Sequence, residues 1–122
     1  MSEGARIAAL LDADEELSAL LGPGTHILQG SLAAQPPYPL PLVLVSANEN
    51  IPLLENEDGV VAEGCRCTIG ILAEGGLEAL ESRTKEVMEE AGYRCEMRKR
   101  LPAGRPEWHC CAMSFSGARL RI

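Results

Sequence analysis

The order of hydrophobic segments along this chain predicts an α+β fold, with a mostly antiparallel sheet of about four strands and two helices packed on one face. A helical pattern opens the chain and a second one follows the first group of strand-like segments. Between and after these helices, hydrophobic and polar residues alternate as they do in half-buried strands. Because the strands are clustered, a repeating βαβ architecture is not expected. The 122 residues predict a single domain over 1–122.

The first segment, from Ser2 to Leu21, is predicted to be helical because its isoleucine and leucines recur with a period near 3.6. Asp12 is followed three positions later by Glu15, which is the spacing of a capping box, so a break or restart is expected near Asp12. The sequence Gly22–Gly24, with a proline at its centre, is expected to end the helix.

The next residues, about 25–41, are predicted to form a proline-rich extended arm. Prolines at 36, 37, 39 and 41 exclude a helix and a central strand here. A buried strand is expected over Leu40–Ala47 and is predicted to break at Asn48–Asn50. A turn of the Asp-Gly type at Asn56–Gly59 then leads into a strand over Val60–Ala73.

A second amphipathic helix and a final hairpin complete the prediction. The helix is expected over Gly76–Ala91, with a glycine at position 92 to end it. The hairpin is expected to join a strand over Tyr93–Leu101 to one over Glu107–Phe115, and Ser116–Ala118 is predicted to end the second strand. Strict alternation along the first of these strands would place Tyr93, Cys95 and Met97 on one side.

Composition excludes several classes of function. The net charge of −7 argues against a duplex-DNA binder, and the aromatic content of 3% argues against single-stranded nucleic acid, so no sequence-specific nucleic acid is expected. The N-terminus lacks the pattern of a signal peptide, and no apolar run approaches the ~20 residues that span a bilayer. We therefore expect no membrane partner, a cytosolic origin and reduced thiols for the five cysteines.

No pattern of chemically active residues predicts an enzyme. The cysteines, which include Cys65, Cys67 and the adjacent pair Cys110–Cys111, stand where small core residues are expected, so core packing is favoured over a metal site or a redox site. His26 and His109 lack a nucleophile and an orienting group at a recognisable spacing. No catalytic residue, cofactor-binding residue or metal ligand is predicted.

One cluster of charge does stand out in this acidic chain. The final hairpin gathers five basic residues: Arg94, Arg98, Lys99, Arg100 and Arg105. They could be a solvated strand face, or they could complement an acidic patch on a partner. If that patch belongs to a second copy, a head-to-tail contact would generate a ring. The hairpin tip could also face DNA inside a channel.

The order of segments resembles that of the small tail-completion, or tail-terminator-like, proteins of bacteriophages and prophages. The features that carry the resemblance are the helical run that ends at Gly22, the arm that ends in Tyr38–Pro41, the strand Leu42–Val45, the later amphipathic helix and the closing hairpin. The arm before the hydrophobic strand is the most specific of these. The number of cysteines and the basic hairpin depart from the family's pattern.

The resemblance implies a structural protein of the virion tail, assembled in the cytoplasm of a bacterial host. Such proteins form rings, commonly hexamers, which cap the tail tube and contribute to head–tail joining. The implied partners are other copies, the tail tube protein and head–tail connector proteins, with no cofactor. A cytosolic adaptor module that binds an acidic partner through the basic hairpin is the alternative. The interface candidates are Tyr38, Leu40, Arg94, Arg98, Lys99, Arg100 and Arg105.

Overall fold

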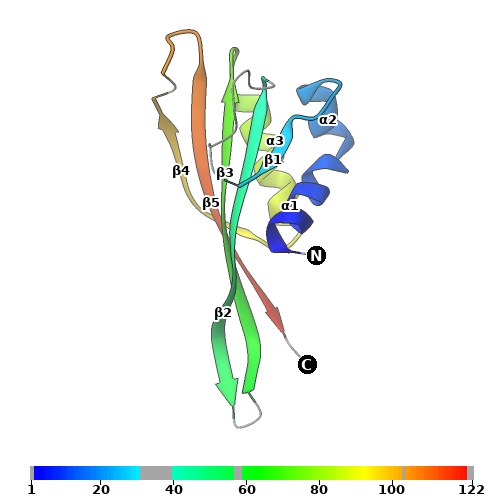
Figure 1. The fold of residues 1–122 in the computed structure, drawn as a ribbon, viewed down its shortest axis with the longest axis vertical. Helices are drawn as coiled ribbons and strands as arrows, with labels where there is room; N and C mark the ends of the chain where they lie inside the picture. The colour runs from blue at the N-terminus through cyan, green and yellow to red at the C-terminus, as the bar shows by residue number, and fades with distance from the viewer. Residues whose placement is uncertain (1, 31–39, 57–58, 103, 121–122) are drawn as a thin grey trace.

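The computed structural model describes the backbone of residues 2–30, 40–56, 59–102 and 104–120, and their side chains except those of 48–56, 59–63 and 119–120. Three helices pack against one side of a twisted five-stranded sheet (Figure 1). The elements in chain order are α1 (Glu3–Asp12), α2 (Glu15–Leu21), β1 (Ile27–Gln29), β2 (Leu42–Asn56), β3 (Gly59–Ala73), α3 (Glu78–Glu90), β4 (Arg94–Leu101) and β5 (His109–Leu120).

The sheet has the strand order β1-β2-β3-β5-β4. β1 runs parallel to β2, and every other pair of neighbouring strands is antiparallel. The predicted fold class, α+β with a mostly antiparallel sheet, is therefore confirmed. The sheet has five strands, however, because the three residues of β1 pair with Val43–Val45 at the start of β2. So short a segment, placed beside a run of prolines, carries no periodic signal.

The single helical pattern predicted at the start of the chain forms two helices, as the expected break near Asp12 allows. Ser2 caps α1 by accepting a hydrogen bond from the backbone N–H of Ala5. The cap of α2 is Asp14, which accepts from the N–H of Leu17 at 2.9 Å, so the capping residue lies two positions beyond the predicted Asp12. α2 ends at Leu21, as Gly22 with its positive φ of 87° requires.

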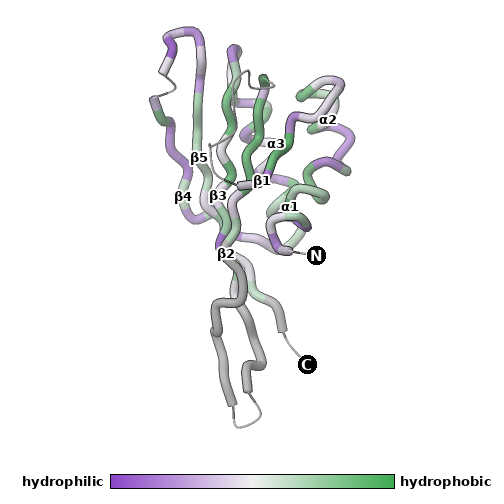
Figure 2. Tube along the Cα trace, in the orientation of Figure 1, coloured by the Kyte–Doolittle hydropathy of each residue, from purple (hydrophilic) through white to green (hydrophobic). Residues whose placement is uncertain are grey.

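The core lies between the helices and the sheet. The helices contribute Ile7, Leu11, Leu17 and Met88, and the N-cap of α3 contributes Leu77, all fully buried. The strands contribute alternate residues, and Figure 2 shows the hydrophobic stretches of β1, β2 and β3 beside one another, with β4 largely hydrophilic. The strand residues of the core are Val43, Val45, Cys67, Ile69, Ile71, Ala73, Cys111, Met113 and Phe115. The predicted role of Cys67 and Cys111 as core residues is confirmed.

Two strands are longer than the sequence predicts. β2 continues through Asn48–Asn50, where a break was expected, and reaches Asn56 with register shifts against β3. β5 continues through Ser116–Ala118 to Leu120, because those residues pair with β3 as far as Ala62. Cross-strand hydrogen bonding by neighbours thus overrides the weak strand propensity of asparagine, serine and glycine. The resulting β2–β3 hairpin extends well beyond the helices (Figure 1).

A β-bulge in β4 changes which side chains face the helices. Cys95 pairs with Phe115 and Met97 pairs with its immediate neighbour Ser114, so Glu96 is an extra residue in β4. Met97 therefore faces away from the helices while Cys95 faces them, and the predicted alternation of these two residues on one side is wrong. Arg98 is opposite Met113 of the core face, which turns it toward the helix side.

Candidate functional site

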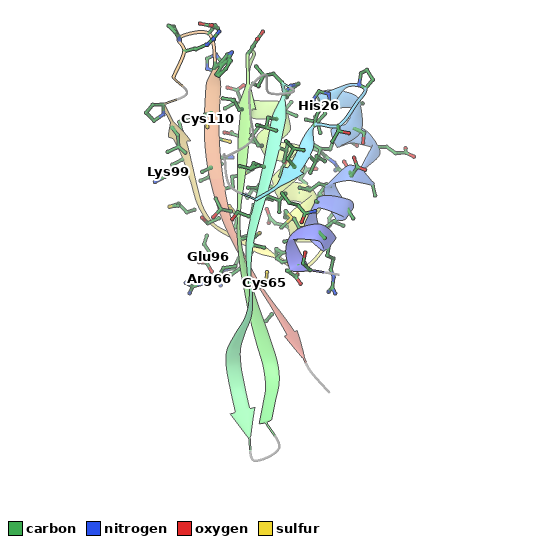
Figure 3. All side chains as sticks on the ribbon, in the orientation of Figure 1. His26, Cys65, Arg66, Glu96, Lys99 and Cys110 are labelled. Carbon is green, nitrogen blue, oxygen red and sulfur yellow. The ribbon has the colours of Figure 1, made fainter. Side chains whose placement is uncertain are left out.

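The first candidate surface is the outward side of β4, the edge strand of the sheet. Beyond the bulge, Met97, Lys99 and Leu101 pair with Ser114, Ala112 and Cys110 of β5 and point away from the helices. Met97 and Leu101 are 45% and 37% exposed, and Lys99 projects outward between them (Figure 3). We call this set, together with the exposed Arg94, the β4 face.

The structure divides the five basic candidates of the hairpin between different environments. Arg100 turns toward α3, where its Nη2 lies 3.2 Å from Oε2 of Glu81 and 3.8 Å from Oε1 of Glu78. Arg105 lies 4.9 Å above the ring of Trp108 and 3.8 Å from a carboxylate oxygen of Glu107. These two cations are thus paired within the chain.

The other three basic candidates remain exposed. Arg94, Arg98 and Lys99 have no carboxylate partner within 4.0 Å among the residues whose side chains are described. Arg94 and Lys99 lie on the outward side of β4, whereas Arg98 lies on the helix side. The basic hairpin predicted as one patch is therefore split by the pleat and the bulge of β4.

The second candidate surface is a groove between α2 and α3, and we call it the α2–α3 groove. It consists of two adjoining cavities of about 410 and 470 Å³, both lined by Leu20 and Ala79. Leu40 and Leu80 add apolar surface at one end. At the other end Glu16 and Glu86 stand at the rim, with side chains 74% and 61% exposed.

Arg83 holds the walls of this groove together. Its guanidinium donates to both carboxylate oxygens of Asp14, at 2.6 and 2.8 Å, and to Glu86 at 3.0 Å. Because Asp14 is also the cap of α2, this bidentate pair fixes the start of α2 against the middle of α3. The hydrogen bonds from Arg83 hold the pKa of Asp14 well below its usual range, at about 2.

His26 fixes the end of the groove at which Leu40 lies. Its ring nitrogens lie 2.8 Å from the carbonyl oxygen of Pro41 and 2.9 Å from that of Pro23. This bridge joins the turn after α2 to the residues just before β2, so Leu40 and Pro41 become part of the groove wall. Leu40, an interface candidate, is half-buried there, whereas Tyr38 falls outside the described residues.

A shallow polar cavity of about 410 Å³ lies on the sheet face that points away from the helices. Ser46, Thr68 and Ser114 form one cross-strand row within it. Arg66 and Glu96 also line it, one of each charge (Figure 3). The mixture of charges gives this cavity no clear preference for a ligand.

The thiols show the environment of packing residues rather than of reactive groups. Burial raises the pKa of Cys67 and of Cys111 to about 12, which disfavours the nucleophilic thiolate. Burial also raises the pKa of Cys110. Within the described residues, no group of three or more metal-ligating side chains lies together, and no helix is long and apolar enough to cross a membrane.

Two buried carboxylates are not among the functional candidates predicted from the sequence. Glu81 is 4% exposed, and its Oε1 has no hydrogen-bond partner among the described residues. Glu3 is 6% exposed and accepts a hydrogen bond from the hydroxyl of Tyr93. Both lie in the first turn of a helix, where glutamate is ordinarily a solvated residue favoured by the dipole. Only the spatial approach of β4 and its flanking residues distinguishes them.

Comparison with known proteins places the fold but no family. Neither a family model nor a curated protein sequence matches the chain. Among solved structures, the chain is similar to one from the "virion of native gene transfer agent (GTA) particle". The TM-score is 0.65 at 19% sequence identity, and the match covers 98% of this chain and 94% of that one. The two proteins share a fold over nearly their whole lengths.

Proposed function

We propose that this chain is a structural protein of a phage-like particle that self-associates into a ring, caps the tail tube and contributes to head–tail joining. The observation that carries the proposal is the fold shared with a chain of a gene transfer agent virion, over 98% of this chain and 94% of that one. The order of segments along the sequence, which resembles that of tail-completion proteins, supports the same role. Its partners would be other copies, the tail tube protein and connector proteins.

The two unlike surfaces support the self-association in this proposal. The β4 face is apolar and carries two cations, Arg94 and Lys99, beside one carboxylate, Glu96, whereas the α2–α3 groove is acidic and apolar. A chain whose opposite surfaces complement each other can add copies head to tail, and a closed ring results when the rotation closes. Such a role needs no catalytic group and no cofactor, and it places the protein in the tail after assembly in the bacterial cytoplasm.

The direct test is to disrupt the gene in a bacterium that produces the particles and to image the particles by electron microscopy. We expect tails that lack heads or tubes of irregular length, and a copy of the gene supplied in trans should restore normal particles. Normal headed particles in undiminished number, together with absence of the protein from purified virions, would refute the proposed role and favour the adaptor alternative.

A further inference from the structure

Among the residues whose side chains are described, large exposed hydrophobic side chains are rare and occupy two places. They are Leu20, Met97 and Leu101, at 43%, 45% and 37% exposure. Leu20 lies in the α2–α3 groove, and the other two lie on the β4 face. An exposed apolar group that forms part of a shaped surface indicates an interaction site more strongly than one that stands alone.

The α2–α3 groove fits an apolar ridge that carries positive charge. Its floor is apolar, with Leu20 and Ala79 shared by both cavities. Three carboxylates, those of Glu16, Glu74 and Glu86, line the two cavities and outnumber the single guanidinium of Arg83. Arg83 pairs at once with Asp14, Glu16 and Glu86, so one guanidinium faces four carboxylates when Asp14 is included, and the net charge of the groove is negative.

The β4 face is a ridge of the required kind. Met97, Lys99 and Leu101 are alternate residues of one strand and therefore stand in a row about 13 Å long. Lys99 lies between the two apolar side chains and has no carboxylate partner among the described residues. β4 is the last strand of the sheet, so its free edge leaves room for another molecule to approach.

We infer that the β4 face of one copy of this chain seats in the α2–α3 groove of a second copy, with Met97 and Leu101 against the Leu20 floor and Lys99 at the acidic rim. The inference rests on the proposed self-association and names its contact. Pairing a groove with a groove would bring carboxylates together, and pairing two β4 faces would bring together surfaces that each carry two cations and only one carboxylate, Glu96. Charge complementarity thus selects the unlike pair.

The contact leaves one surface unused on each copy, the groove on the copy that gives its β4 face and the β4 face on the copy that gives its groove. β4 is at one edge of the sheet, and α2, which forms one wall of the groove, lies toward the β1 edge (Figure 1). A copy bound through its β4 face can therefore still accept another copy in its groove. This is a heterologous contact, which builds rings or open chains rather than closed dimers.

Mixing two blocked variants tests the contact. Leu20→Arg blocks the groove but leaves the β4 face intact, and the double variant Met97→Glu, Lys99→Glu does the reverse. The altered residues are exposed, so both variants should fold, and circular dichroism would verify this. Matched controls are Ala9→Arg on the exposed side of α1 and Lys85→Glu on α3.

We expect each blocked variant alone to be a monomer by light scattering and the controls to assemble like the unaltered chain. An equimolar mixture of the two blocked variants should form dimers and nothing larger, since one groove and one β4 face remain usable per pair. Folded variants that assemble normally would overturn the inference while leaving self-association in place. A mixture that stays monomeric, or an unaltered chain that never associates, would overturn it too. The proposed role in the particle would then still be tested separately, by electron microscopy of particles from the gene disruption.

Discussion

At the level of single residues, Asp14 has two structural roles, because its one carboxylate both caps α2 and binds Arg83 of α3. A lost cap of this type costs about 1 kcal/mol of unfolding free energy. We expect Asp14→Ala to cost at least that much, because the Arg83 guanidinium also loses its bidentate partner. Urea unfolding at pH 7 would measure the difference, and Asp12→Ala, an exposed residue that caps no helix, is the matched control. Equal stability of the two variants would contradict this role.

The same ion pair gives stability a defined dependence on pH. The pKa of Asp14 falls from 3.8 to about 2 on folding, so its contribution is fully present above about pH 4. As the pH falls from 4 to 2 the carboxylate becomes protonated in the folded state and that contribution is lost. We expect the stability difference between the unaltered chain and Arg83→Gln to shrink over this range. A difference that is independent of pH would contradict the pairing.

Thiol reactivity tests how the cysteines are placed. Cys67 and Cys111 are buried with a pKa raised to about 12, whereas Cys65 and Cys95 are half-buried. In alkylation of the native protein at pH 8 followed by peptide mass spectrometry, we expect Cys67 and Cys111 to remain unmodified until the protein is denatured. Rapid labelling of either thiol under native conditions would show that it is not part of the core.

At the scale of elements, Arg100 joins the edge strand β4 to α3 through the buried carboxylate of Glu81. Arg100→Gln should cost about 1–3 kcal/mol, because a buried carboxylate then loses its charged donor. The double variant Arg100→Gln, Glu81→Gln should cost less than the sum of the single changes, since neither charge is left alone. Denaturant unfolding measures the coupling, and Arg98→Gln on the same strand should change stability by less than about 0.5 kcal/mol. Additive effects would contradict the pair.

The start of α1 is held to the sheet by a second such link. The Tyr93 hydroxyl donates to the buried Glu3, and Gly117 leaves space for the ring, since a Cβ there would lie 2.8 Å from the ring carbon Cδ1. We expect Tyr93→Phe and Gly117→Ala each to lower the unfolding free energy, by about 1–3 kcal/mol for the lost hydrogen bond. Gly75→Ala, which meets no neighbouring atom, is the control for the glycine change. Unchanged stability in both variants would refute the link.

The sequence predicts elements whose hydrophobic periodicity is strong, but it does not predict features that depend on contacts with other elements of the fold. The stripe of α3 and the alternation in β3 from Cys65 to Ile71 are local patterns, and both were predictable. The bulge at Glu96 was not, because a β-bulge depends on how β4 meets β5. Leu20 continues the leucine period of α1, yet the restart at Asp14 changes the phase of α2 and leaves it exposed. The groove and the β4 face therefore required the structure.

At the scale of the whole molecule, the protein has opposite surfaces that differ in charge but share apolar character. The β4 face ends the sheet at one edge, and the α2–α3 groove lies among the helices that cover one of its faces. The long β2–β3 hairpin extends beyond both (Figure 1). A chain with a net charge of −7 repels its own copies at long range, whereas Lys99 and the acidic groove attract at the contact, and salt screens both effects.

The most direct test of the central claim, self-association, is the molar mass of the purified chain in solution over a wide range of concentration. Size-exclusion chromatography coupled to light scattering gives this mass without assumptions about shape. We expect a species of several copies whose share grows with concentration and that disappears in Leu20→Arg. A mass that remains at the monomer value of 13.1 kDa at every concentration would contradict it.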